Sequence, residues 1–325
     1  MSDFALPPDG LLTASAPGDL HEAVRGWLPI GARPLETEAG RVGAIGDRAR
    51  LEIGPRGAFG LHRSPPAVSP TLRIGAYGCY VTGSDELWIG GPHAVAAVEP
   101  LCGRARVELD APPRAELFAA LSLASALLLA ARGRLLMHCG AVRAPDGGVW
   151  LLAGDSHSGK TSTALGLARA GWALLADDHV VLHERGDELH VAGWLRPLHP
   201  DAGWREGVLT GRRVELDPRA VAGLSVVPEG PLAGVLLPQI ARGAARTTLR
   251  SAAPSEAMAA LLRQGAWSLV QPSAARGVLG LLSRAAALPC AHAALAPDSY
   301  RSPELMARLL GSVLERRARG EVAVA

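Results

Sequence analysis

The sequence predicts an α/β protein in which a smaller β-rich portion, residues 1–112, precedes a larger α/β domain, residues 113–325. Two observations carry this prediction. Short apolar segments broken by glycine and proline dominate the first part, which is typical of β-strands joined by turns. In the second part, strand-like and helix-like segments follow one another around a glycine-rich loop. A hydrophobic content of 48% is ample for a sizeable core.

The first part begins with a predicted helix at residues 19–28, DLHEAVRGWL. Strands are expected within three apolar segments, which are RARLEIG, TLRIGAYGCYVTG and ELWIGG. A long helix is predicted from about Pro113 to Arg132, because proline suits a first helical turn and Gly133 follows the end. Its apolar run, residues 117–131, is shorter than the about 18 residues that span a membrane. We therefore interpret it as a buried helix that opens the second domain.

The second part is predicted to contain two hairpins, a central helix, further strands and three later helices. In chain order these are a hairpin over residues 135–154 turning at 145–148, a helix at 161–171, a buried strand at 172–176, a hairpin over 179–193 turning at 185–187, a strand at 231–238, and helices at 255–265, 275–288 and 302–319.

Composition excludes several classes of partner. The net charge is +2 and no Lys/Arg-rich block is present, so nothing favours nucleic acid or an anionic membrane as a partner. The first residues lack a basic segment followed by an apolar one, and we expect a cytoplasmic protein. The cysteines show no CxxC spacing and are interpreted as small core residues. They are Cys79, Cys102, Cys139 and Cys290.

The segment GDSHSGKT at residues 154–161 satisfies the pattern G-x-x-x-x-G-K-[ST] between a predicted strand and a predicted helix. That context is the one a phosphate-binding P-loop requires, because loop N–H groups and the positive helix end together bind polyphosphate. Lys160, the only lysine of the chain, would reach the β- and γ-phosphates, and Thr161 would offer its hydroxyl to Mg²⁺. The residues predicted to bind the nucleotide are Gly154, Asp155, Ser156, His157, Ser158, Gly159, Lys160, Thr161 and Ser162.

Two adjacent carboxylates, Asp177 and Asp178, follow at the end of the next predicted strand. In a parallel arrangement that strand end lies beside the loop. Two carboxylates there can divide the work, one holding Mg²⁺ or its waters and the other accepting the proton of an attacking hydroxyl. A guanine-specifying NKxD sequence is absent, so ATP is the expected nucleotide.

These residues resemble the catalytic domain of HPr kinase/phosphorylase, a P-loop group that shares its fold with phosphoenolpyruvate carboxykinase. The resemblance covers about a seventh of the chain, residues 137–182, through MHCGAV, the loop and ADD. It implies that Asp178 is the proton acceptor for a target serine, that Asp177 joins Thr161 on Mg²⁺, and that His138 belongs to the active site. The side chains of His157 and His179 are interpreted as incidental.

The chain also departs from that family. The downstream signature around a Mg²⁺-binding glutamate is absent, with Glu206 the nearest candidate, so phosphorylase activity is not expected. A later arginine near the phosphates would be Arg242, Arg246 or Arg250. The first 110 or so residues do not match the family's regulatory domain, which makes HPr a doubtful substrate. The chain looks similar to a looser group of shorter relatives, some of which resemble serine kinases that act on a precursor peptide. Relatives form ring-like oligomers, so a homo-oligomer is left open.

Three functions therefore remain. The leading hypothesis is an ATP- and Mg²⁺-dependent kinase acting on a serine-type hydroxyl of a protein or peptide, with Asp178 as base and Lys160 as electrostatic stabiliser. The second is a small-metabolite kinase, although such enzymes usually space their aspartates as D-x-D. The third is a nucleotide-dependent binding module that transfers nothing.

Overall fold

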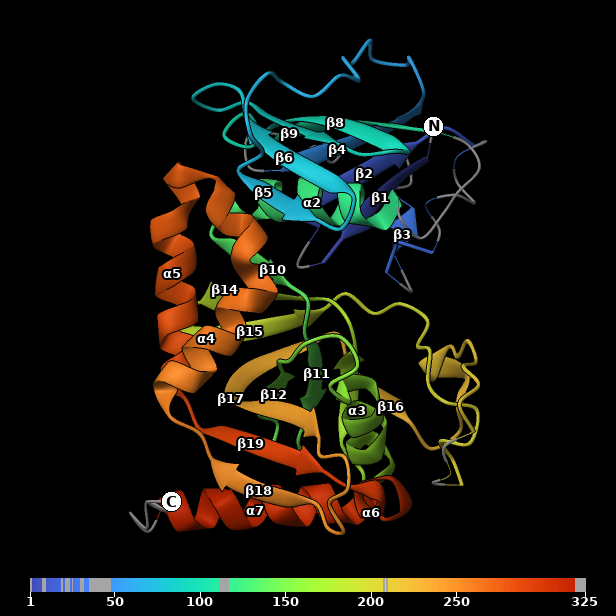
Figure 1. Ribbon diagram of the computed structural model, residues 1–325, viewed down its shortest axis with the longest axis vertical. Helices are drawn as coiled ribbons and strands as arrows, with labels where there is room; N and C mark the ends of the chain where they lie inside the picture. Colours follow the sequence, from blue (N-terminus) through green and yellow to red (C-terminus); the bar gives the residue numbers. More distant parts are fainter. Residues whose placement is uncertain are drawn as a thin grey trace. The chain divides into compact units, whose positions relative to one another are not determined.

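The computed structural model describes residues 2–7, 10–18, 20, 24, 26–29, 32–34, 48–110, 117–206, 208 and 210–318. It is a mixed α/β structure with extensive sheets (Figure 1). The chain divides into two compact units, Met1–Leu136 with Ala266–Leu279 and Met137–Gly265 with Gly280–Ala325. Half of the residues of the helix expected at 19–28 lie outside the described residues.

The first unit is built on one sheet, with the buried helix α2 (Leu117–Ala130) packed against β4, β8 and β9 (Figure 1). The predicted β-rich character of this part is confirmed. Within the described residues the strands follow in the order β3 (Arg33–Pro34), β1 (Ser2–Leu6), β2 (Leu12–Ala16), β4 (Ala49–Pro55), β9 (Arg104–Leu109), β8 (Ala94–Glu99), β7 (Leu87–Gly90), β6 (Tyr77–Val81) and β5 (Leu72–Ile74).

Helix α2 belongs to this first unit, whereas the sequence had placed it at the start of the second domain. The division between the units falls at Leu136 and Met137, within strand β10 (Arg134–Met137). The described residues Leu121, Leu127 and Leu128 of α2 are fully buried. A helix without a polar face does not reveal which sheet it will cover, so its sequence could not assign it to a domain.

The second unit contains the predicted loop and aspartates in a mixed sheet. The expected hairpins, the strand at 172–176 and the helices after Gly159, Ala253 and Ser302 are confirmed. The strands follow in the order β14 (Val180–Arg185), β15 (Glu188–Gly193), β17 (Glu229–Ile240), β12 (Val149–Leu152), β11 (Gly140–Arg143), β13 (Ala173–Ala176) and β16 (Ser225–Val226), with β19 (Cys290–Leu295) paired to β17 and to β18 (Thr248–Ser251).

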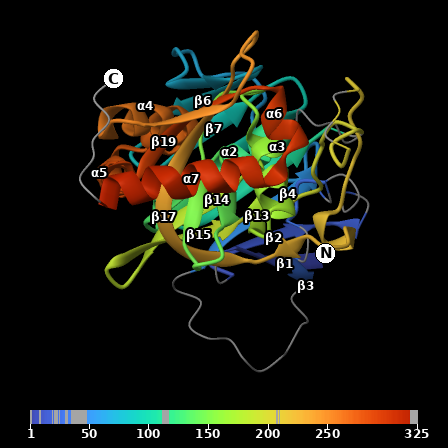
Figure 2. The ribbon, with the colours of Figure 1, turned by 90° about the horizontal axis from the view of Figure 1, so that it is seen from below.

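Helices of the second unit cover this sheet. Helix α3 (Lys160–Arg169) packs on β11 and β13, and α7 (Pro303–Ala318) packs on α3 and β18 (Figure 2). The others are α4 (Pro254–Gly265), α6 (Pro297–Arg301) and α5 (Pro272–Ala287), which runs across the division between the units. Short 3₁₀ turns occur at Pro218–Ala220 and Ala266–Val270.

The four cysteines do not all lie in the core. Cys79, Cys139 and Cys290 are buried as expected, but Cys102 is exposed, and none of the four forms a disulfide. Cys102 lies in the turn between β8 and β9, where its neighbour Leu101 is also exposed. Among the described helices, none combines the length and the apolar character needed to cross a bilayer.

Candidate active site

The Gly154–Thr161 loop joins the buried strand β12 to helix α3. A Cβ atom at Gly154 would lie 2.7 Å from the Ser158 hydroxyl oxygen and 3.2 Å from the backbone oxygen of Pro238. Gly159 has φ of 103° and caps the helix without a side-chain hydrogen bond. Both glycines are therefore required by the local geometry, one by close approach and the other by its left-handed backbone.

His157 is also held in an unusual conformation. Its φ is 63°, and it is the only non-glycine residue with positive φ in the described part of the chain. Such strain concentrates at functional sites. The imidazole Nδ1 lies 3.4 Å from Nη2 of Arg213, so the exposed His157 side chain faces a loop that follows β15.

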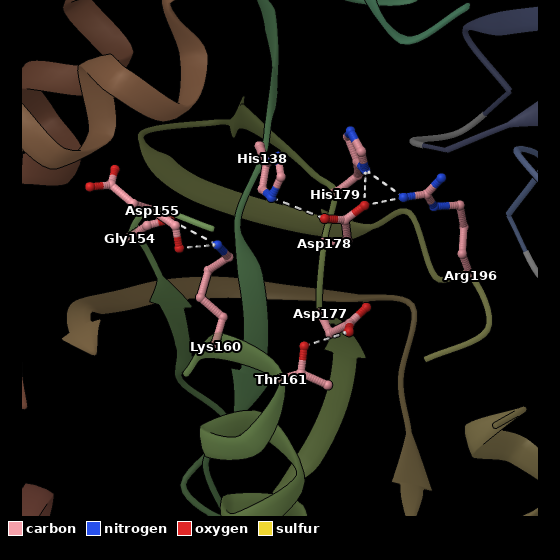
Figure 3. Close-up of polar contacts among 9 residues, drawn as sticks. All are labelled: His138, Gly154, Asp155, Lys160, Thr161, Asp177, Asp178, His179 and Arg196. Atoms are coloured by element: carbon pink, nitrogen blue, oxygen red, sulfur yellow. Dashed lines mark hydrogen bonds and ion pairs between the residues drawn. The ribbon is translucent and has the colours of Figure 1, made fainter. Parts of the chain in front are cut away.

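Lys160 is the first residue of α3 and its side chain turns back onto the loop (Figure 3). Its ammonium donates hydrogen bonds to the backbone oxygens of Gly154, at 2.8 Å, and Asp155, at 3.0 Å. The residue is 8% exposed, and burial lowers the pKa of the ammonium below its ordinary value. Both partners are uncharged carbonyls, so the ammonium keeps its positive charge for an anion that enters the loop.

The Ser158 hydroxyl is a second feature of the loop. It is buried, and it has no hydrogen-bond partner among the residues that the structure describes. The loop that holds Lys160 thus also contains an unsatisfied polar group. A phosphate oxygen could supply the missing hydrogen bond.

Thr161 and Asp177 are brought together from α3 and the end of β13. The Thr161 hydroxyl donates to Oδ2 of Asp177 at 3.0 Å. Burial, together with the neighbouring Asp178 carboxylate, raises the pKa of Asp177 to about 6. The pair therefore forms a half-buried acidic oxygen cluster whose charge a cation would balance.

Mg²⁺ fits this pair of oxygens. Octahedral Mg²⁺ with ligand oxygens at about 2.1 Å separates adjacent ligands by about 3.0 Å, as these two oxygens are. Within the described ranges, no group of three or more His, Cys, Asp or Glu residues is placed to hold a metal. Nucleotide oxygens and water would thus complete the coordination, which is how Mg²⁺ commonly binds at phosphate sites.

Asp178 lies at the centre of a hydrogen-bonded cluster (Figure 3). Its Oδ1 is 3.0 Å from Nε2 of His138, and its Oδ2 is 2.9 Å from Nδ1 of His179 and also accepts from the Arg196 guanidinium. Burial alone would raise the pKa of Asp178, but the hydrogen bonds from His138 and His179 and the Arg196 charge hold it well below its usual range. This carboxylate is therefore kept ionised and fixed in direction.

The order of the strands explains why these residues meet. Strands β12 and β13 both pair antiparallel with β11, so they run parallel to each other on either side of it. The ends of β12 and β13 and the start of β11 consequently share one edge of the sheet. His138 precedes β11, and a Cβ atom at Gly140 would lie 3.2 Å from the backbone oxygen of Asp177, which shows how closely these segments approach.

The structure thus brings the predicted residues Lys160, Thr161, Asp177, Asp178 and His138 to one edge of the sheet, with the loop beside them. Ser162, the last residue predicted to bind nucleotide, hydrogen-bonds the side chain of Tyr300 in α6.

The candidate glutamate and the candidate arginines from the sequence do not join this cluster. Glu206 is exposed, Arg246 is exposed, and Arg250 is paired with Glu256 at 2.7 Å. Arg242 lines a pocket beside the loop.

Sequence reasoning missed two contacts of Asp178. His179 was interpreted as incidental, yet it is 11% exposed and lies against the carboxylate, and burial lowers the pKa of this histidine. Its position directly after the aspartates was the signal that could have identified it. Arg196 was not singled out, because it lies in the segment after β15 and only the fold brings it to Asp178.

No family model matches the chain, and no curated protein matches it. A solved structure with some likeness is the HPr(Ser) kinase/phosphatase from Coxiella burnetii, at a TM-score of 0.33 and 13% sequence identity. The likeness covers 57% of this chain and 93% of that chain. A TM-score this low does not establish a shared fold, so the function of this chain has to be argued from its own residues.

Proposed function

We propose that the protein is an ATP-dependent kinase that transfers the γ-phosphoryl group to a serine-type hydroxyl of a protein or peptide. The observation that carries the proposal is the meeting of three parts at one sheet edge. These are the lysine-bearing loop, the Thr161 and Asp177 oxygen pair, and the fixed carboxylate of Asp178.

The loop and its lysine would bind the polyphosphate of ATP. Phosphate oxygens would replace the Gly154 and Asp155 carbonyls as acceptors of the hydrogen bonds from the Lys160 ammonium. They would also accept hydrogen bonds from loop N–H groups. The positive end of α3 adds to this attraction. Thr161 and Asp177 would hold Mg²⁺, which neutralises charge on the phosphates when bound.

Asp178 would receive the proton of the acceptor. In the transfer, the acceptor oxygen forms a bond to the γ-phosphorus, the bond from that phosphorus to the β–γ bridging oxygen breaks, and the hydroxyl proton passes to Asp178. Because the transition state is loose, orienting the hydroxyl matters more than removing its proton early. His138, His179 and Arg196 fix the carboxylate for that task.

The proposal does not include efficient phosphorylase activity. The sequence lacks the glutamate signature that accompanies phosphorylase activity in the family it resembles, and Glu206, the nearest candidate, is exposed. The acceptor is proposed to be a protein or a peptide, with a precursor peptide as one form of it. The cytoplasm is the proposed location of the reaction.

The test is transfer from γ-labelled ATP with Mg²⁺ into a lysate of the source cells, followed by separation of labelled proteins, peptides and metabolites. Wild type should label a discrete protein or peptide on serine, and Asp178→Asn should not, while both bind ATP equally. A labelled small metabolite would replace the proposed acceptor class. ATP binding without any labelled product would make the chain a nucleotide-dependent binding module instead.

A further inference from the structure

A pocket of about 650 Å³ opens beside the Gly154–Thr161 loop, entirely within the second unit. Its walls are the first half of the loop, the end of strand β17 at Leu237–Ile240, and helix α4. Arg242 and His292 complete the lining. A volume of this size is within the range of small-molecule sites, which bind ligands of nucleoside size and larger.

The pocket lies on the side of the loop away from the proposed transfer centre. Neither the Thr161 and Asp177 pair nor the Asp178 cluster contributes to its lining. Figure 3 shows Gly154 and Asp155 on one side of the Lys160 side chain, and Asp177 and Asp178 on the other. The order of the strands agrees with this separation. Strands β17 and β19, on the pocket side, lie on one side of β12, whereas β11 and β13, which lead to His138 and the aspartates, lie on the other.

The lining combines apolar walls with cationic side chains. Ala259 and Ala260 of α4 carry only methyl groups, and Leu237 and Pro238 form the opposite apolar surface. This is the composition of pockets that take a flat apolar ring with a few polar groups around it. Small side chains on α4 leave the space open.

Of the two arginines in the pocket lining, Arg242 is the one suited to contact a ligand. Glu256, the acidic side chain of α4 in the lining, is occupied by Arg250 at 2.7 Å and by the Ala253 N–H at 2.8 Å. Arg263 is held near the loop, with its Nε 3.6 Å from Oδ1 of Asp155. Arg242 is exposed in the pocket wall, where its planar guanidinium can stack on an aromatic ring.

We propose that this pocket receives the nucleoside part of the bound nucleotide, with the base between the alanines of α4 and the end of β17, and Arg242 against the base. The inference rests on the proposed function. In a nucleotide whose phosphates lie in the loop and whose γ-phosphate faces Asp178, the nucleoside must extend from the loop on the side away from Asp178. The pocket opens on that side. An acceptor hydroxyl, by contrast, must reach Asp178, which the pocket does not contain.

The test compares ATP with inorganic tripolyphosphate, which has the phosphates and lacks the nucleoside, by titration calorimetry in the presence of Mg²⁺. Ala259→Trp fills the pocket from an exposed helix position, and Arg242→Ala removes the guanidinium. Both variants should weaken ATP binding by at least about tenfold and leave tripolyphosphate binding unchanged. Ser255→Trp, on the same helix and outside the lining, is the matched control and should change neither.

Three results would overturn the inference. ATP binding that is unaffected by Ala259→Trp would show that the nucleoside lies elsewhere, and equal weakening of both ligands would show that the substitution distorts the loop. A raised KM for the acceptor with unchanged ATP binding would make the pocket an acceptor site. Failure of the proposed function looks different, because wild type would then bind neither ligand, or Lys160→Ala would bind tripolyphosphate as tightly as wild type.

Discussion

At the scale of single residues, Lys160 is the group on which the proposed nucleotide binding should depend most. Its ammonium is buried, lies against two carbonyl oxygens of its own loop, and has a pKa that burial has lowered. Those carbonyls offset only part of the cost of burying a cation. An arriving polyphosphate would supply full negative charge to the same group, so binding should gain most of its electrostatic energy at this position.

Replacing Lys160 by alanine should therefore weaken ATP binding by at least about tenfold, because a charge-assisted contact with phosphate is lost. Titration of ATP into wild type and Lys160→Ala measures the difference. Thermal unfolding of the two proteins provides the control, since equal unfolding temperatures would show that the loop variant is folded. An ATP affinity that is the same in both proteins would remove the loop from nucleotide binding.

Thr161 permits a closely matched pair of variants. Thr161→Val keeps the shape of the side chain and removes the hydroxyl that lies 3.0 Å from Asp177, whereas Thr161→Ser keeps the hydroxyl. The valine variant should need about tenfold more Mg²⁺ for half-maximal ATP binding, and the serine variant should behave nearly as wild type. Mg²⁺ titrations at fixed ATP test this. Identical Mg²⁺ dependence in all three proteins would exclude the hydroxyl as a ligand.

Part of the candidate site could be read from the residues themselves. Lys160, Thr161, Asp177 and Asp178 follow a short local spacing, and the structure brings them together. Arg196 could not be found in this way, because it contacts Asp178 across 18 positions of the chain and no local pattern indicates such a contact. The roles of all of these side chains in a reaction stay predictions.

At the scale of elements, helix α4 illustrates how the pocket wall is held. Glu256 in its first turn accepts a hydrogen bond from the Ala253 N–H, which caps the helix, and it is paired with Arg250 of β18. Arg250, followed by the Ala253 N–H, lowers the pKa of Glu256 to about 2. One carboxylate therefore secures the start of α4 and links the helix to the neighbouring strand.

The pH dependence of stability should report this carboxylate. A folded pKa of about 2 below an ordinary value of 4.5 means that the ionised group stabilises the fold above pH 4.5, and that this contribution is lost as the pH falls toward 2. Glu256→Gln should thus lower the free energy of unfolding by about 1 kcal/mol or less near neutral pH, since the ion pair is partly exposed. Denaturant unfolding of both proteins at several pH values measures the gap, which is the difference in the free energy of unfolding between wild type and Glu256→Gln.

That gap between wild type and Glu256→Gln should be constant near neutral pH and should narrow through the acid range. A gap that does not change with acidification would show that packing of the side chain, and not its charge, is what Glu256 contributes.

The elements that sequence could predict are those with strong periodicity or clear ends. Helix α3 ends at Arg169 and is followed closely by Gly171, which has φ of 92°, and β13 is a run of four buried apolar residues. Strands β8 and β19 were not predicted, because AVAAVE and CAHAAL are rich in alanine, which has little preference for strands. Their pairing with β9 and with β17 and β18 supplies what the local sequence lacks.

At the scale of the whole molecule, the chain forms two compact units, and the candidate site is contained in one of them. All side chains assigned to nucleotide, magnesium and proton transfer lie in the second unit. Residues 266–279 also belong to the first unit, although they follow most of the second unit in the sequence. Sequence reading finds one boundary along a chain more readily than such a return, because no local signal marks it.

The four free thiols should report the integrity of the whole molecule. Burial raises the pKa of Cys79 and of Cys139 to about 12, and Cys290 is also buried, whereas Cys102 is exposed. Because the thiolate is the reactive form, iodoacetamide should modify only Cys102 in the native protein and all four thiols in denaturant. Mass spectrometry of the peptides distinguishes these states. Rapid modification of Cys139 in the native protein would contradict the packing around His138.

The most direct test of the central claim is the stoichiometry of the reaction with the acceptor identified in the labelling experiment. Wild type with Mg²⁺ and ATP should form one ADP for each phosphate incorporated into a serine of the acceptor, and Asp178→Asn should form neither above background. ADP released with free phosphate, while the acceptor stays unmodified, would show a hydrolase and contradict a kinase built on this loop and these aspartates.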